Sequence, residues 1–132
     1  AAALEKGYTP ATRMLDAPFV SFDVSTGDYW RPANYTEGRS YGMVTLRIAL
    51  EKSLNQVTAR VAQDIGMEAV SELSERLGVY TKLPPYAAMS LGAGDAYLID
   101  MARGYAAFVN GPCAGPSRAH PVPTRPARVC GM

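Results

Sequence analysis

This sequence has no marked excess of positive or negative charge, no long apolar stretch and no cysteine before residue 113. Its 132 residues carry 13 Lys or Arg against 12 Asp or Glu, so no basic excess marks a nucleic-acid-binding protein. No window approaches the roughly 18 consecutive apolar residues of a membrane-spanning helix, and the N-terminus lacks the pattern of a secretory signal. With 48% hydrophobic residues, the sequence predicts one small globular domain.

Composition changes sharply near the C-terminus. Residues 112–132 contain no acid, Lys, Leu, Ile or aromatic residue, but five of the ten prolines and both cysteines. Cys113 and Cys130 match no zinc pattern, and His120 has no partner in view, so we assign these three residues no role. We therefore expect a body, residues 1–111, and a Pro/Arg-rich tail, residues 112–132, that forms neither helix nor strand.

Helices are predicted where apolar residues recur every three or four positions and a stop signal follows. The predicted helices are 1–6, 45–52, 56–65, 68–77 and 96–109. Gly7, Gly66 and Gly78 follow three of them, and Thr45 can cap the second. The apolar stripes expected to face inward are Val57, Val61, Ala62 and Ile65, then Val70, Leu73 and Leu77, and finally Leu98, Met101, Ala102, Tyr105 and Val109.

One strand and three irregular segments are predicted between these helices. Residues 18–25 alternate, with Val20, Phe22 and Val24 on one face, which indicates a half-buried strand. The predicted irregular segments are 29–40, 83–85 and the small-residue run 90–94.

Ser53-Leu54-Asn55 is the one short motif that could carry chemistry. It lies at the junction of two predicted helices, where a hydroxyl and a carboxamide can point into the same cleft. The hydroxyl can pass a proton, and the amide can both donate to and accept from a peptide bond. Ser and Asn between helices are also ordinary capping residues, so the tripeptide alone leaves both interpretations open.

The surrounding residues resemble class A (bifunctional) penicillin-binding proteins. The matching segments are Trp30-Arg31-Pro32-Ala33-Asn34-Tyr35, Gly42-Met43-Val44-Thr45-Leu46-Arg47, Ser53-Leu54-Asn55, Ser90-Leu91-Gly92-Ala93-Gly94 and residues 100–111. Residues 2–10 look like the end of that family's nucleophile helix. The resemblance covers residues 2–111 in unbroken order and is to the transpeptidase domain.

The resemblance implies an α+β fold: a helix-rich partial lobe of the penicillin-binding and serine β-lactamase-like fold, with only the start of its antiparallel sheet. It implies peptidoglycan D,D-transpeptidation through a serine acyl-enzyme, with peptidoglycan stem peptides and β-lactams as partners and no cofactor or metal. The catalytic residues that it implies here are Ser53, which would relay a proton to the leaving D-alanine, and Asn55, which would hold the donor backbone. The family is anchored in the cytoplasmic membrane with this domain outside; no membrane segment or signal is present in this sequence.

Two of the family's three motifs do not occur in the sequence. No Ser-x-x-Lys is present, and Tyr80-Thr81-Lys82 does not supply Lys-Thr-Gly. We therefore expect an internal fragment that is inactive alone, because a covalent step needs its nucleophile. We also expect it to be marginally stable, because the opening half-helix and the predicted strand lack their partners. The alternative is a non-catalytic helical interaction module built on the same lobe.

The tail also departs from the family after Gly111, where Pro112 replaces a second glycine. It is either a disordered linker or the product of a frameshift in GC-rich DNA. We favour the frameshift, because a linker would interrupt the domain between two of its own motifs.

Overall fold

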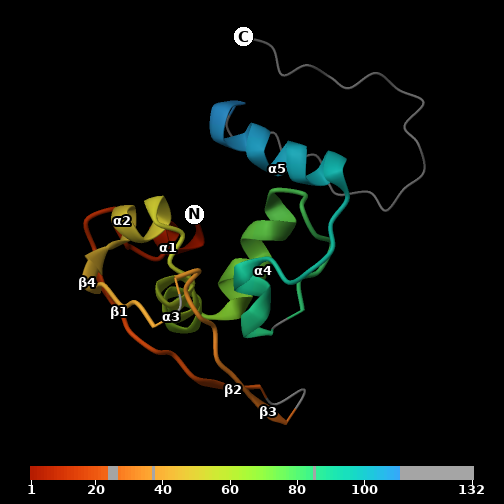
Figure 1. Cartoon of the computed structure of the whole chain (residues 1–132). Helices are drawn as coiled ribbons and strands as arrows, with labels where there is room; N and C mark the ends of the chain where they lie inside the picture. Colours follow the sequence, from red (N-terminus) through yellow and green to blue (C-terminus); the bar gives the residue numbers. More distant parts are fainter. Residues whose placement is uncertain (24–26, 37, 85, 111–132) are drawn as a thin grey trace, which may run out of the picture. The chain divides into compact units, whose positions relative to one another are not determined.

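The computed structural model describes residues 1–23, 27–36, 38–84 and 86–110 (Figure 1). The expected tail, 112–132, with Cys113, His120 and Cys130, lies outside the described residues. The chain divides into two compact units. The first unit is Ala1–Val70 with Pro84–Asp95, and the second is Ser71–Leu83 with the chain from Ala96 onward.

The first unit holds most of the regular structure. Its elements are α1 (Ala2–Glu5), β1 (Arg13–Asp16), β2 (Ser21–Asp23), β3 (Asp28–Trp30), β4 (Gly42–Thr45), α2 (Leu46–Glu51), α3 (Asn55–Ile65) and η1 (Ala87–Leu91), a 3-10 helix. The described strands form two antiparallel pairs, β1 with β4 and β2 with β3. With helices packed beside short antiparallel strands, the chain is an α+β partial lobe, as the sequence predicts.

The β1–β4 pair was not expected from the sequence. Met14 lies opposite Val44, and Asp16 lies opposite Gly42. Both strands are only four residues long, and β1 contains no β-branched or aromatic residue, so no local signal identifies it. The pairing brings Asp16 to the start of the segment that leads into α2.

The β2–β3 hairpin corrects the predicted strand 18–25 in length and in burial. Among the described residues, pairing covers Ser21–Asp23 against Asp28–Trp30, so the strand begins three residues later than predicted and the predicted irregular segment 29–40 is wrong at its first two residues. Val24 and Ser25 lie outside the described residues. Val20 and Phe22 are 52% and 53% exposed, because no layer of the described residues covers that face of the ribbon. The buried aromatic residue is instead Phe19, which contacts the Trp30 ring edge-on.

The helices that flank Ser53 are confirmed close to their predicted bounds. Thr45 Oγ1 accepts a hydrogen bond from the Ile48 amide at 3.3 Å, so it caps α2 as expected. Inside the first unit, β4, α2 and α3 share one apolar cluster formed by Val44, Ala49, Leu54 and Val57. Val57 is completely buried, so the expected apolar stripe of α3 does face the core. The predicted loop 90–94 is partly wrong, since η1 includes its first two residues and ends at Leu91, with Gly92 as its C-cap.

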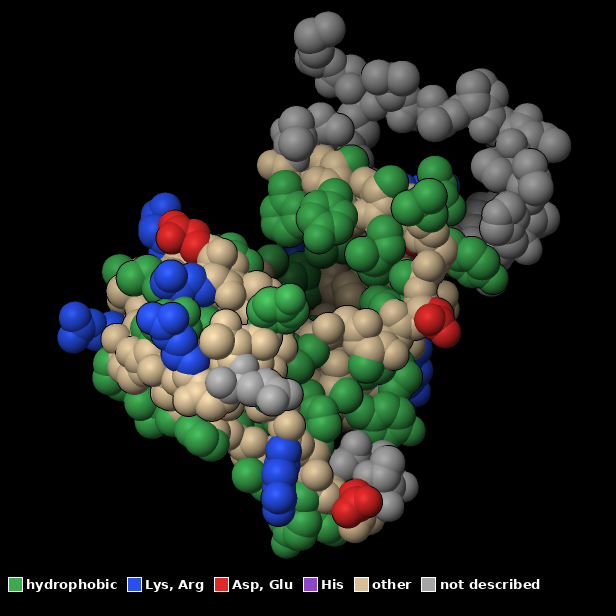
Figure 2. All heavy atoms as spheres, in the orientation of Figure 1, with side chains coloured by type: hydrophobic (Ala, Val, Ile, Leu, Met, Phe, Trp, Pro, Cys, Tyr) green, Lys and Arg blue, Asp and Glu red, His purple; other side chains and the backbone are tan. Residues whose placement is uncertain are grey.

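The second unit contains the last part of α4 (Met67–Arg76) and all of α5 (Leu98–Asn110). Gly104 packs so closely on Val79 that an added Cβ would lie 2.5 Å from its Cγ2. The predicted inward face of α5 is wrong for Leu98, Met101, Ala102 and Tyr105, which are all exposed, Leu98 and Tyr105 at 86% and 69%. The side chain of Val109 lies outside the described residues. The helix instead turns its glycine to Val79, where the absence of a Cβ allows the close approach. Figure 2 shows the resulting hydrophobic surface on α5.

None of the helices in the described ranges is both long and apolar enough to cross a bilayer.

Candidate active site

The turn between α2 and α3 holds Ser53. Helix α2 ends at Glu51 and α3 begins at Asn55, so Ser53 lies between two helices where the sequence predicts it. Its amide donates to the Leu50 carbonyl at 3.1 Å. Ser53 is the only non-glycine residue with a positive φ, +50°, in the part of the chain that the structure describes. This left-handed conformation is unfavourable for an L-residue, so the turn is held by its surroundings.

Leu54 anchors this turn from the inside. Its side chain is 3% exposed and belongs to the apolar cluster with Ala49 and Val57. Its amide donates to the Ala49 carbonyl at 2.9 Å, which ties the turn back onto α2. With Leu54 buried, the preceding Ser53 is exposed, and its hydroxyl makes no hydrogen bond to any described residue. The hydroxyl is therefore accessible to a ligand.

Asn55 is the first residue of α3, and its amide is already oriented. Asn55 Nδ2 donates to the Ala33 carbonyl at 2.8 Å, from the segment Trp30–Tyr35. The cap position of α3 is Leu54, and no side chain of its own caps that end. The capping interpretation of Ser53 and Asn55 therefore has no support, since neither side chain bonds to a free amide of the α3 first turn. Asn55 keeps Oδ1 and a second N–H for other partners.

Two residues that we did not single out from the sequence, Asp16 and Asn34, form hydrogen bonds that lead to the first turn of α3. Asp16 is completely buried, and its Oδ1 accepts from Asn34 Nδ2 at 2.9 Å. Its Oδ2 accepts from the Tyr41 amide at 2.8 Å. Asn34 Oδ1 in turn accepts from the Gln56 amide, in the first turn of α3, at 3.2 Å.

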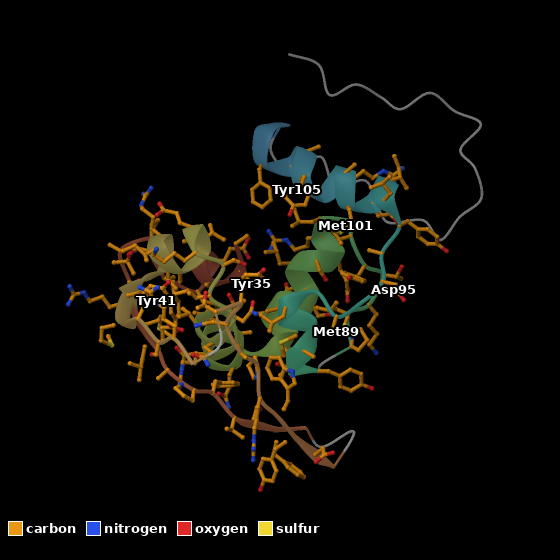
Figure 3. The ribbon with its side chains drawn as sticks, viewed as in Figure 1. Tyr35, Tyr41, Met89, Asp95, Met101 and Tyr105 are labelled. Carbon is orange, nitrogen blue, oxygen red and sulfur yellow. The ribbon has the colours of Figure 1, made fainter. Side chains whose placement is uncertain are left out.

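A sequence signal for these two residues existed but was weak. Asn34 belongs to the quoted segment Trp30–Tyr35, and Asp16 is an acid set between Leu15 and Ala17-Pro18. Asn34 is 6% exposed, whereas the neighbouring Tyr35, labelled in Figure 3, is 99% exposed. The inward asparagine was therefore hidden inside a polar and aromatic segment that the sequence predicts to be irregular.

Two cationic side chains near Ser53 in the first unit pack on the Tyr41 ring. Lys52, the preceding residue, places its ammonium 5.2 Å from the centre of the Tyr41 ring. The Arg39 guanidinium lies 5.1 Å from the same ring. Figure 2 shows Lys and Arg side chains on this part of the first unit. Within the described ranges, no three His, Cys, Asp or Glu side chains are grouped as metal ligands would be.

Comparison with known proteins identifies the family. The penicillin-binding protein transpeptidase domain model matches residues 1–117. Penicillin-binding protein 1A of Vibrio cholerae serotype O1 is 38% identical over 110 residues, covering 83% of this chain and 13% of that protein. The relative from Rickettsia felis is 36% identical over 113 residues, with 83% and 14% covered.

A solved structure agrees with these matches. The crystal structure of penicillin-binding protein 1A from Haemophilus influenzae superposes with a TM-score of 0.75 at 32% identity, covering 83% of this chain and 16% of that one. The chain thus spans about one seventh of the length of its curated relatives. It belongs to the transpeptidase domain family of the class A penicillin-binding proteins.

Proposed function

We propose that this chain forms one edge of the active site of a peptidoglycan D,D-transpeptidase, with Ser53 and Asn55 as its functional side chains. In this proposal the nucleophilic serine of a Ser-x-x-Lys motif attacks the carbonyl of the penultimate D-alanine of a stem peptide. The C–N bond then breaks, and the terminal D-alanine leaves as its amine after taking a proton that Ser53 relays. Asn55 holds the donor peptide backbone.

The accessible Ser53 hydroxyl, held in a left-handed turn beside an oriented Asn55 amide, carries this proposal. Both groups belong to residues fixed by the protein core through Leu54, so little conformational freedom is lost when a substrate binds. The free Asn55 Oδ1 can accept from a substrate N–H, and the second N–H can donate to a carbonyl.

Helix α1 supports the proposal from a second direction. It corresponds to the end of the helix on which the family carries its Ser-x-x-Lys motif, by the resemblance of residues 2–10. The Tyr8 hydroxyl, just after α1, donates to the Asp64 carboxylate of α3. This bond ties the end of the proposed nucleophile helix to the helix that begins with Asn55.

The sequence itself contains no Ser-x-x-Lys and no Lys-Thr-Gly, so we propose that the reaction needs parts of the domain that this chain does not contain. The complete protein would act on peptidoglycan stem peptides and be acylated by β-lactams. We place it outside the cytoplasmic membrane, held by an anchor.

A hybrid protein tests the proposal. In it, the segment of this chain that aligns with Vibrio cholerae penicillin-binding protein 1A replaces the matching 110 residues of that protein. We expect the hybrid to be labelled covalently by a fluorescent penicillin, and the chain alone not to be labelled. Ser53→Ala in the hybrid should slow acylation about 10²–10⁴-fold, the usual contribution of a proton-transferring group. A folded hybrid that stays unlabelled, or an unaffected Ser53→Ala variant, would contradict the proposal.

A non-catalytic helical interaction module is the second candidate. It is favoured by the exposed apolar residues of α5, including Leu98 at 86% and Phe108 at 68%. The same hybrid separates the two functions, because a module without a catalytic role predicts a folded hybrid with no penicillin label.

A further inference from the structure

A buried carboxylate is connected to the start of α3, next to Ser53, through one intermediate side chain. Asp16 is completely buried, at the end of β1, and both carboxylate oxygens accept hydrogen bonds. Its backbone carbonyl also accepts from the Ser40 hydroxyl. Burying a carboxylate is unfavourable unless its oxygens are bonded, and an apolar side chain could fill the same space without that requirement. The fold alone does not explain why an acid stands here.

Asn34 connects this carboxylate to the site. A carboxylate can only accept, so Asp16 draws the Asn34 amide nitrogen toward itself, at 2.9 Å. The Asn34 oxygen is thereby turned toward α3, where it accepts from the Gln56 amide at 3.2 Å. Asp16 thus determines which way the Asn34 amide points.

The Asn34 contact supplies what α3 lacks at its first turn. The first amides of a helix have no partner within the helix, and the cap residue Leu54 offers no side-chain acceptor. Asn34 provides that acceptor from another segment, and the adjacent Ala33 carbonyl accepts from Asn55 Nδ2 at 2.8 Å. Two neighbouring residues of one segment therefore hold two neighbouring residues of α3.

We propose that Asp16 and Asn34 are positioning residues for the Ser53–Asn55 turn, with Asp16 orienting Asn34 and Asn34 fixing the start of α3. The proposal rests on the proposed function of Ser53 and Asn55. Neither residue has to touch substrate. Their effect is to keep the Asn55 amide and the Ser53 hydroxyl in register with the nucleophile, where misplacement by about 1 Å can cost about 10²-fold in rate.

The first test measures penicillin acylation of the hybrid described above. Asp16→Asn and Asn34→Ala should each slow acylation about 10- to 100-fold. Most of this loss should lie in the acylation rate constant and little of it in the reversible binding of penicillin. Asp28→Asn makes the same chemical change at an exposed hairpin residue and should leave the rate unchanged. Single variants that stay folded and acylate at the rate of the parent would overturn the proposal.

An exchange variant tests the orientation directly. The double substitution Asp16→Asn with Asn34→Asp can retain every hydrogen bond: the new amide at 16 donates to the new carboxylate at 34, which still accepts from the Gln56 amide. We expect it to recover most of the lost rate. If the single variants do not fold, this variant alone decides the question, because a folded exchange variant that remains slow overturns the proposal.

A double-mutant cycle separates positioning from plain stability. If Asn34 acts through Asn55, Asn34→Ala should cost far less in an Asn55→Ala background, whereas independent effects would multiply. Multiplying losses in folded variants would overturn the inference while leaving the proposed function intact. An unsubstituted hybrid that folds but takes no label would instead contradict the proposed function.

Discussion

The two units of the chain differ in how far each can bury its own apolar surface. Of the nine buried apolar residues among those described, eight lie in the first unit and only Leu83 lies in the second. The second unit carries α5, on which Leu98, Tyr105 and Phe108 are all more than two thirds exposed. Figure 3 shows Tyr105 projecting from this helix.

This difference indicates that buried apolar contacts stabilise the local structure in the first unit more than in the second. The proposed functional residues Ser53 and Asn55 belong to the unit with the core, and the residue between them, Leu54, is part of that core. In the described part of the second unit, Gly104 packs closely on Val79, and Leu83 is the one buried hydrophobic side chain. Substitutions in the two units should therefore have different consequences for stability.

The largest expected contrast is between two leucines. Leu54→Ala, at a residue 3% exposed, should lower the free energy of unfolding by about 2–5 kcal/mol, because it opens a cavity in the core. Leu98→Ala, at 86% exposed, should change it by no more than about 0.5 kcal/mol. Urea unfolding followed by circular dichroism measures both variants, because Leu98 lies in the second unit and the fluorescence of Trp30, the only tryptophan, reports the first unit. Equal losses would show that the comparison is wrong.

Two aspartates give the next contrast. Asp16→Ala removes the partner of the buried Asn34 amide and should cost about 1–3 kcal/mol, the usual penalty for an unpaired buried donor. Asp100 pairs with Arg103 at 3.0 Å on α5, where the Arg side chain is 57% exposed. Asp100→Ala should cost no more than about 1 kcal/mol, and less in high salt. The same unfolding experiment, repeated at two salt concentrations and followed by circular dichroism, distinguishes them.

Gly104→Ala tests the close packing of Gly104 on Val79 in the second unit. The added Cβ would lie 2.5 Å from Val79 Cγ2, and such overpacking should lower the free energy of unfolding by about 1–3 kcal/mol. This loss should exceed the stabilisation of about 1 kcal/mol from replacing a helical glycine by alanine. In a Val79→Ala background the clash is absent, and the same change should become stabilising. Amide hydrogen exchange of α5 would measure both effects. A stabilising Gly104→Ala in the original chain would mean that this contact is not close.

The smallest effect concerns the capped end of α2. Thr45→Ala removes the acceptor for the Ile48 amide and should cost about 1 kcal/mol. Thr45→Ser keeps the hydroxyl and serves as the matched control. If both variants lose the same stability in Trp30-monitored unfolding, packing of the Thr45 methyl group matters more than the cap.

Local patterns predicted the helices of this chain well, and non-local pairings were missed. The bounds of α2 and α3 follow from apolar spacing and from Thr45 and Gly66, all of which act within one or two turns. Strand β1 depends instead on β4, nearly thirty positions away, and has no distinctive residues of its own. The inward face of α5 was wrong because spacing identifies an apolar stripe but not the surface that covers it.

The same distinction applies to the candidate site. Ser53 and Asn55 could be proposed from the sequence because they form one contiguous motif, and their catalytic role stays a prediction. Asp16 could not be proposed, since its proposed role depends on Asn34 and Tyr41, residues brought beside it only by the fold. A buried acid with distant partners carries no local pattern in the sequence.

At residue 53 the backbone conformation and the proposed proton-relay role favour different side chains. A φ of +50° favours glycine by about 1–2 kcal/mol over a residue with a side chain. Random variants of this segment selected only for resistance to unfolding should therefore accumulate glycine at this position. Variants of the hybrid selected for penicillin labelling should keep the serine. The two selections should therefore yield different residues at position 53. The difference in free energy of unfolding between the glycine and serine variants would measure the stability lost by keeping the hydroxyl.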